Sequence, residues 1–233
     1  MKPSFDLNSI LQNGFSFKYE RPPGWGMKGV QDVTISTHQI GELILTSGRL
    51  LAWDLLIGPD ERYFFKKTVT PGTYPVVLSI ADFHPTGETR VACAMLVLGS
   101  RGPAVSWELA AINNPDTESN ADIDQYGVDS GTGSFMDVDT VQILNPLWES
   151  TERNEPDKFE EFCDEVLVEM EKHSFGSRGT ANWANITLSE GTGANVVTFS
   201  SGWGDGGYAS FWGYDAHGDL TCLVTDFDLF ITS

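Results

Sequence analysis

Four aspartates have the side-chain type that could perform acid–base chemistry or hold Mg²⁺, and each lies in a glycine-flanked or aromatic-flanked segment near the end of a predicted strand. If they converge, two of the carboxylates could act as general acid and general base, while nearby aromatic rings stack a sugar or a base. The candidate catalytic residues are Asp129, Asp137, Asp205 and Asp226. The candidate ligand-binding residues are Trp203, Tyr208 and Trp212.

The same segments also have a purely structural interpretation. In the stretch SGWGDGGYASFWG, Asp205 could cap its own turn by accepting hydrogen bonds from backbone amides. The stretch DSGTGS resembles the phosphate-gripping loop of actin-like ATPases, but its mid-chain position in a β-rich, acidic setting argues against phosphate binding. It also lacks the GK[ST] of a Walker A loop. We therefore interpret it as a glycine turn between Val128 and Phe135, in which Asp129 and Asp137 bond turn amides.

The sequence predicts no metal site and no cofactor. Acidic residues between positions 116 and 124 alternate like EF-hand ligands, but Ala121 and Gly127 stand where that motif needs glycine and glutamate. The four histidines show no metal-binding spacing. The three cysteines lack CxxC spacing and are expected to be buried free thiols: Cys93, Cys163 and Cys222. No GxSxG motif occurs, but residues that are distant in the sequence could still form a catalytic triad. The sequence therefore leaves open whether the chain is an enzyme.

Short runs rich in Val, Ile, Thr, Phe and Tyr, separated by turn residues, predict a mainly β or α+β fold with β-sandwich-like antiparallel sheets. One amphipathic helix, packed on a sheet, is predicted over about residues 155–173. Its expected apolar face is Phe159, Phe162, Cys163, Val166, Leu167 and Met170. Residues 195–230 predict a three-stranded meander whose first hairpin turn is Gly-Asp-Gly-Gly. We expect a single domain over residues 1–233, with an acidic surface loop at about 113–124.

The net charge of −19 is distributed unevenly along the chain. Residues 1–100 hold nine basic and nine acidic residues, whereas residues 101–233 hold five basic and twenty-four acidic residues. A field this negative repels nucleic acid and anionic membranes, so neither is an expected partner, whereas a basic protein would be attracted. Because the chain has neither a membrane-spanning apolar run nor a secretory signal, a cytoplasmic location is expected.

Several blocks of sequence together carry a resemblance to a known family. In chain order they are SGRLLAWDLL, TVTPGTYPVVLSIA, TRVACAMLVLG, VSWELA, YGVDSGTGSFMD and SGWGDGGYASFWGYDAHGDLTCLVTDF. They resemble the bacterial domain-of-unknown-function family 4241 over nearly the whole chain. The AWDLL stretch departs from the family's AxDP pattern, which implies an altered turn there. The resemblance implies a full-length single module and brings no activity with it.

Three hypotheses about function follow. In the first, the chain is a non-enzymatic cytosolic protein-binding module whose acidic surface, from Glu108 to Glu171, engages a basic protein. Neutralisation of a basic toxin, as immunity proteins perform it, is one form of this hypothesis. In the second, the chain is a hydrolase or small-ligand-binding protein that uses the four aspartates with the Trp/Tyr platform. In the third, the chain is a scaffold without a site.

Overall fold

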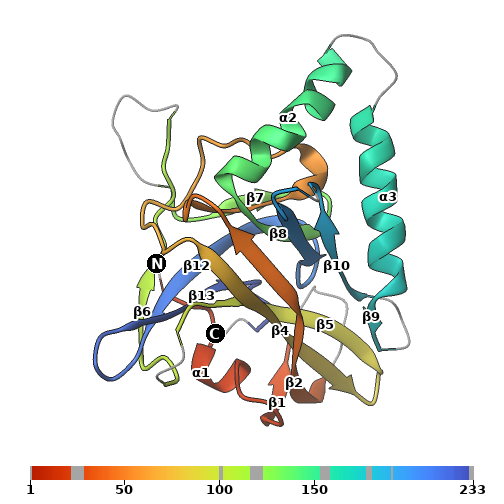
Figure 1. Ribbon diagram of the computed structural model, residues 1–233. Coiled ribbons are helices and arrows are strands. Elements are labelled where there is room, and N and C mark those ends of the chain that lie inside the picture. The colour runs from red at the N-terminus through yellow and green to blue at the C-terminus, as the bar shows by residue number, and fades with distance from the viewer. Residues whose placement is uncertain are drawn as a thin grey trace.

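The computed structural model describes residues 2–21, 29–99, 102–115, 123–152, 158–176, 180–189 and 191–230 (Figure 1). Within these ranges the chain forms two antiparallel β-sheets and three α-helices. No helix of the described residues is long and apolar enough to cross a membrane. The mainly β fold with sandwich-like antiparallel sheets, predicted from the sequence, is confirmed.

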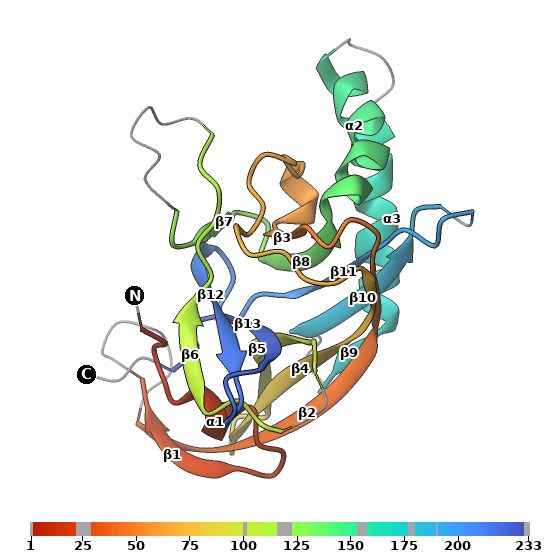
Figure 2. The same ribbon diagram turned by 60° about the vertical axis from the view of Figure 1, so that its left-hand side comes forward.

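The larger sheet curves into a half-barrel. In spatial order its strands are β1 (Ser16–Glu20), β2 (Val30–Leu45), β4 (Gly72–His84), β5 (Glu88–Val97), β13 (Leu220–Asp226), β12 (Gly206–Tyr214) and β6 (Ser106–Leu109), with β7 (Tyr126–Val128) also pairing with β12. The long strand β2 sweeps along the base of the molecule in Figure 2. Its register against β4 shifts at Gly41, where a Cβ would lie 2.6 Å from Nδ2 of Asn185 in the other sheet. Glycine therefore permits this close approach between the two sheets.

The smaller sheet faces the inside of the half-barrel. Its strands, in spatial order, are β3 (Leu50–Trp53), β8 (Thr132–Asp137), β11 (Asn195–Ser200), β10 (Ala181–Thr187) and β9 (Ser174–Phe175). Alternate side chains of both sheets meet in the main core, as strand pleating requires. The larger sheet contributes Leu43, Leu78, Leu96, Trp212 and Leu223, and the smaller sheet contributes Leu50, Phe135, Val197 and Phe199.

Helices cover the outer faces of both sheets. The short helix α1 (Leu7–Ile10) packs on the larger sheet, where Leu7 and Ile10 join a second core cluster. The smaller sheet is covered by α2 (Val138–Glu152), α3 (Lys158–Lys172) and the 3-10 turn η1 (Leu55–Ile57). Figure 1 shows α2 and α3 standing next to each other at one end of the β-structure.

Helix α3 confirms the amphipathic helix predicted over about 155–173, although residues 153–157 lie outside the described part of the chain. Acidic residues Glu160 and Glu161 lie in its first turn and Lys172 in its last, which suits the helix dipole. One residue of the expected apolar face was assigned wrongly, because Leu167 is 42% exposed. The buried stripe is narrower than expected and follows Phe159, Val166 and Met170.

Helix α2 was not predicted. Its apolar residues Val141 and Leu144 are buried against the smaller sheet, and Asp137 accepts a hydrogen bond from the N–H of Asp139 at 2.9 Å, as an N-cap residue does. Pro146 lies inside the helix, where a residue without an N–H is unfavourable. Because a proline normally argues against a helix, the sequence around Pro146 did not indicate one.

The meander predicted over residues 195–230 was partly wrong. Strands β12 and β13 do form an antiparallel hairpin, but β11 pairs with β8 and β10 in the smaller sheet. The Gly-Asp-Gly-Gly stretch therefore carries the chain from one sheet to the other. At Gly202, φ is +49°, and a Cβ would lie 2.9 Å from the backbone oxygen of Phe227, so this crossing requires glycine.

The acidic loop predicted at about 113–124 lies mostly outside the described residues, since positions 116–122 are not among them. The residues on either side of this stretch are paired, because Ile112 and Ile123 exchange backbone hydrogen bonds of 3.0 and 3.2 Å. All three cysteines are free thiols, and Cys163, expected to be buried, is only partly so.

Candidate functional site

Asp137, a predicted catalytic candidate, lies fully buried where β8 meets α2. Its carboxylate accepts hydrogen bonds from the Ser47 N–H at 3.1 Å, the Ser47 hydroxyl at 2.8 Å and the Gly48 N–H at 3.2 Å, besides that from Asp139. The Thr46 hydroxyl, at 3.4 Å, is a fifth donor, so the carboxylate is fully engaged by the fold. In this structure Asp137 joins the turn before β3 to the start of α2.

Asp226, at the end of β13, is 2% exposed and holds the N-terminal segment. It accepts hydrogen bonds from the N–H and the hydroxyl of Ser4, at 3.0 and 2.9 Å, and from the N–H of Asp228 at 3.0 Å. Burial, with a further contribution from the nearby charge of Asp228, raises the pKa of Asp226 to about 6. A buried carboxylate with a raised pKa is a feature of acid–base sites, but here its oxygens bind the chain itself.

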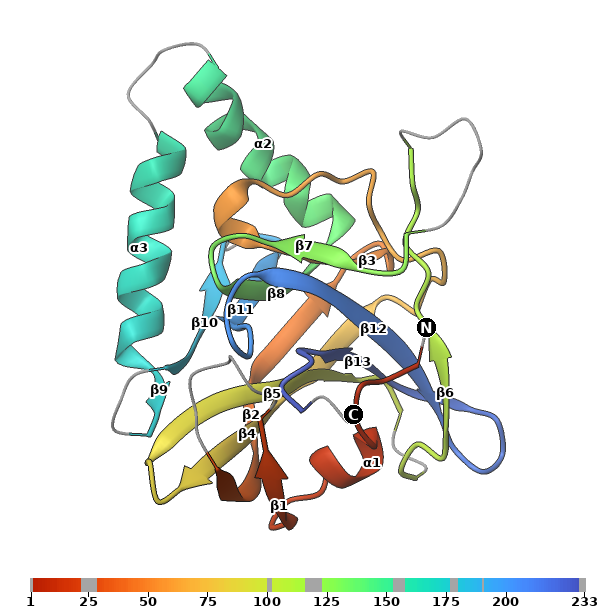
Figure 3. The same cartoon turned by 180° about the vertical axis from the view of Figure 1, so that it is seen from behind.

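Asp129 and Asp205 are both exposed and lie on neighbouring turns. Asp129 directly follows β7 and Asp205 directly precedes β12. The two strands lie side by side in Figure 3, and Val128 pairs with Gly206. The turns are also joined by a 3.0 Å hydrogen bond from the Ser201 N–H to the Gly131 carbonyl. The four candidate aspartates thus occupy three separate places, and only this pair is brought together. The described residues contain no group of three or more His, Cys, Asp or Glu side chains that could hold a metal ion.

The three candidate aromatic residues do not share a cavity wall. Trp212 is 1% exposed and Tyr208 is 5% exposed, and both belong to the core between the sheets. Trp203 instead packs against the cluster on the outer face of the larger sheet. There the guanidinium carbons of Arg21 and Arg90 lie 3.5 and 4.9 Å from its ring centroid. These rings therefore do not form the common platform that the sequence hypothesis requires.

Asp54, which the sequence analysis did not identify, explains the DSGTGS stretch. Its fully buried carboxylate accepts hydrogen bonds from the N–H groups of Asp129 and Ser130, at 2.9 and 2.7 Å. The hydroxyls of Ser130 and Thr132, at 2.5 and 3.0 Å, and the Leu56 N–H, at 3.1 Å, complete the set. The glycine turn therefore does bind an anion, but the anion is a side chain of the same protein.

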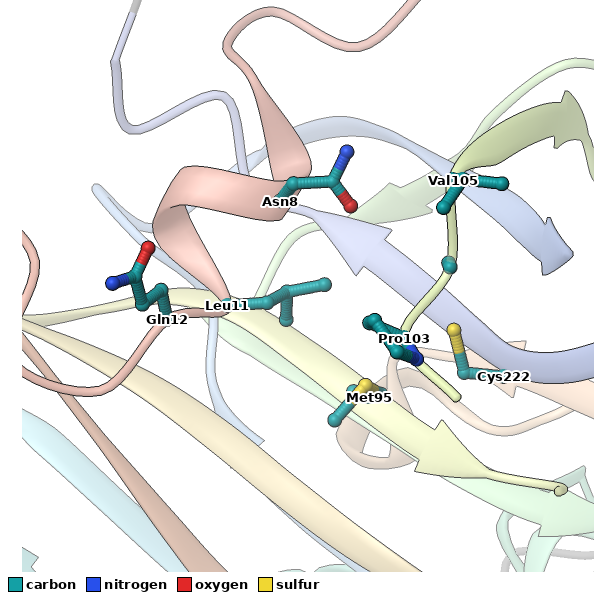
Figure 4. A pocket seen from close by; sticks show the side chains of 8 residues that line it. Asn8, Leu11, Gln12, Met95, Pro103, Val105 and Cys222 are labelled. Carbon is teal, nitrogen blue, oxygen red and sulfur yellow. The ribbon is translucent and has the colours of Figure 1, made fainter. Parts of the chain in front are cut away.

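A mostly apolar cavity of about 580 Å³ opens between α1, β5, β13 and the segment before β6 (Figure 4). Its lining residues are Asn8, Leu11, Gln12, Met95, Pro103, Ala104, Val105 and Cys222. Leu11 faces Pro103 and Cys222 across the cavity in Figure 4. Burial raises the pKa of the Cys222 thiol, which keeps it protonated and weakly nucleophilic at neutral pH. None of these described lining residues carries a charge, so they suit an uncharged molecule.

A second cavity, of about 500 Å³, lies between the segment that follows η1 and helix α2. Its walls are Trp53, Gly58, Pro59, Asp60, Glu61, Arg62, Tyr63, Asn145 and Trp148. We call it the aromatic cavity. No sequence signal pointed to it, because its tryptophans are far apart in the chain and each lies in an unremarkable local pattern.

Helix α3 presents an acidic surface to solvent. Its exposed acidic residues, which we call the α3 acidic surface, are Glu160, Glu161, Asp164, Glu165 and Glu171. Leu167 and Val168 are 42% and 56% exposed within the same surface. Glu108, the first residue of the acidic surface expected from the sequence, is not part of it. Glu108 lies on β6 and is paired with Lys67 at 2.9 Å.

The chain belongs to the family described as "protein of unknown function (DUF4241)", whose model matches residues 43–225. The resemblance inferred from the sequence blocks is thereby confirmed. No curated protein and no solved structure matches the chain. The family description names no activity.

Proposed function

We propose that this chain is a non-enzymatic binding protein that uses the α3 acidic surface to engage a basic protein, of which neutralisation of a basic toxin is one form. The observation that carries the proposal is the arrangement of α3. Leu167 and Val168 lie between Asp164 and Glu171 on the solvent-facing side of the helix. An apolar centre surrounded by charged residues is typical of protein–protein interfaces.

Charge supports the same proposal. Only two lysines, Lys158 and Lys172, accompany the six acidic residues of α3, and Lys172 is already paired with Glu169 at 2.6 Å. The surface is therefore negative overall and would accelerate encounter with a positively charged partner. The same field disfavours nucleic acid and anionic lipid.

Neutralisation of three acids tests whether the location of the charge matters. The variant Glu160→Gln/Glu161→Gln/Asp164→Asn removes charge from the α3 acidic surface. The control Glu20→Gln/Asp129→Asn/Asp205→Asn removes the same charge from exposed positions elsewhere. We expect the α3 variant to bind a fluorescent octalysine peptide roughly three- to 150-fold more weakly, because three exposed charge pairs are lost at about 0.2 to 1 kcal/mol each. Equal weakening by both variants would show that only net charge matters, and the proposal would fail.

A second candidate function is the binding of a small uncharged molecule, and the apolar cavity beside α1 favours it. A volume of about 580 Å³ is typical of ligand pockets, and the carboxamides of Asn8 and Gln12 at its edge could orient a polar group of the ligand. Like the second hypothesis from the sequence, this candidate is a small-ligand-binding function. The residues differ, because neither the four aspartates nor the Trp/Tyr platform lines this cavity.

The neutral fluorophore N-phenyl-1-naphthylamine tests this candidate, because its emission rises when it enters an apolar cavity. Leu11→Trp would place a bulky indole in the cavity and narrow it, whereas Leu11→Ala would enlarge it. We expect the tryptophan variant to lose the fluorescence increase and the alanine variant to retain it. If both variants respond like the original protein, the fluorophore binds elsewhere and the cavity is not its site.

A further inference from the structure

Three aromatic rings, those of Trp53, Tyr63 and Trp148, line the aromatic cavity. Trp53 and Tyr63 lie with ring centroids 5.3 Å apart, and the Trp148 ring packs against Gly58 and edge-on against Phe159 of α3, at 4.9 Å. Trp148 nevertheless remains 42% exposed. Its ring is therefore held by both neighbours while part of its surface stays open to a ligand.

The orientation of Trp148 depends on the absence of a side chain at position 58. Gly58 adopts a φ of +84°, and a Cβ there would lie 2.4 Å from Cε3 of Trp148. The Gly58 carbonyl also accepts a hydrogen bond from the Trp53 indole N–H at 3.0 Å. One glycine thus positions both tryptophans of the cavity.

The charges in the cavity wall leave one carboxylate available. Arg62 donates to Asp60 from Nε at 3.0 Å and from Nη2 at 2.6 Å, so this pair compensates its own charge. Glu61 accepts a single long hydrogen bond, from Asn145 Nδ2 at 3.5 Å, and forms no ion pair among the described residues. The described wall therefore has a net charge of −1, carried by Glu61. Trp53, Tyr63 and Trp148 line the same cavity.

We infer that the aromatic cavity binds an arginine side chain of the basic partner, with the guanidinium stacked on the indole of Trp148 and paired with Glu61. A guanidinium is planar, carries five donors and stacks on aromatic faces, and it matches a carboxylate with two parallel hydrogen bonds. A lysine ammonium has neither the plane nor the fork. This inference rests on the proposed function, because Trp148 contacts Phe159 in the first turn of α3, the turn that also contains Glu160 and Glu161 of the α3 acidic surface.

The test uses N-acetyl-arginine methylamide and follows the indole N–H resonances of the intact protein by NMR. Matched probes are N-acetyl-citrulline methylamide, which keeps the shape without the charge, N-acetyl-lysine methylamide, and glucose. The resonances of Trp53 and Trp148 are assigned with Trp53→Phe and Trp148→Phe. We expect saturable shifts of these two resonances with the arginine compound, and at least tenfold weaker binding for the other probes.

Glu61→Gln should weaken arginine binding by about tenfold or more, because it replaces a charge-assisted pair by a neutral one. Glu20→Gln removes the same charge from an exposed position on β1, outside the aromatic cavity and the α3 acidic surface, and should change arginine binding less than twofold. No shift with the arginine compound, or equal shifts with citrulline or glucose, would overturn the inference. Because the octalysine measurement does not require a guanidinium site, the proposed function can stand if this inference fails, and a failure of the proposed function would appear separately in the octalysine measurement.

Discussion

The replacement Asp54→Asn tests the role that the structure gives to the glycine turn at 129–132. Asp54 is fully buried and its two oxygens accept five hydrogen bonds. Asparagine preserves the volume of the side chain but replaces one oxygen by an NH₂ group, which donates and cannot accept. The substitution therefore changes the hydrogen bonding with almost no change in packing.

The expected cost depends on where the NH₂ group settles. At the position of Oδ2 it would face two fixed backbone donors, those of Asp129 and Ser130. At the position of Oδ1 it would face two hydroxyls, which can rotate to accept, and one fixed donor, the Leu56 N–H. The second arrangement is therefore favoured. One buried N–H without a partner and weaker remaining bonds together cost about 2 to 4 kcal/mol of the free energy of unfolding.

Urea unfolding followed by circular dichroism measures this cost. With a slope near 2 kcal/mol per M, the midpoint should fall by roughly 1 to 2 M for Asp54→Asn at an unchanged slope. Asp129→Asn is the matched control, because the Asp129 side chain is exposed and only its backbone N–H binds Asp54; it should change stability by less than about 0.5 kcal/mol. A midpoint shift below about 0.3 M for Asp54→Asn would refute the role assigned to this carboxylate.

Two further predictions concern Asp226 and Gly202. Burial raises the pKa of Asp226 to about 6, above its value in the unfolded chain, so its stabilising contribution is complete below about pH 4 and is lost as the pH rises through about 6. The urea midpoint of the original protein should therefore fall between about pH 5 and pH 7.5. Asp226→Asn should reduce this fall, because asparagine cannot ionise. Each unit of difference between the folded and unfolded pKa corresponds to about 1.4 kcal/mol of the free energy of unfolding. An unchanged fall would contradict this account. Gly202→Ala should lower the free energy of unfolding by about 1 to 3 kcal/mol, because its Cβ would lie 2.9 Å from Phe227 at a φ of +49°. In calorimetry Gly127→Ala, with open space around its Cβ, should have a much smaller effect, and equal effects would count against the steric argument.

The sequence was sufficient for those parts of the fold that depend on local patterns. The strands follow from short runs of β-branched and aromatic residues between turn residues, and helix α3 follows from hydrophobic periodicity; both signals act over a few residues. The pairing of β11 could not be predicted in the same way. A glycine turn between two strands is compatible both with a hairpin and with a crossing between sheets, and Gly202 favours the crossing only because Phe227 approaches it.

The chemistry of the buried carboxylates also depends on distant contacts. Asp54 lies 76 positions before Ser130, and nothing in the local sequence of either residue indicates that the two meet. The sequence identified the glycine turn, but it assigned the bonding of its amides to Asp129 and Asp137, whereas Asp54 binds them and Asp137 binds the amides of Ser47 and Gly48. The aromatic cavity was missed for the same reason, since Trp53 and Trp148 come from a strand of the smaller sheet and from a helix that the sequence did not predict.

The most direct test of the proposed function is a salt titration of octalysine binding by three proteins: the original chain, the α3 triple variant and the control triple variant. If the α3 acidic surface engages basic partners, raising salt from about 0.05 to 0.5 M should weaken binding strongly for the original chain and the control, through screening. The α3 variant should bind weakly at low salt and show a flatter dependence. Binding by the original chain that does not change over this salt range, or identical salt dependence of the two variants, would contradict the account.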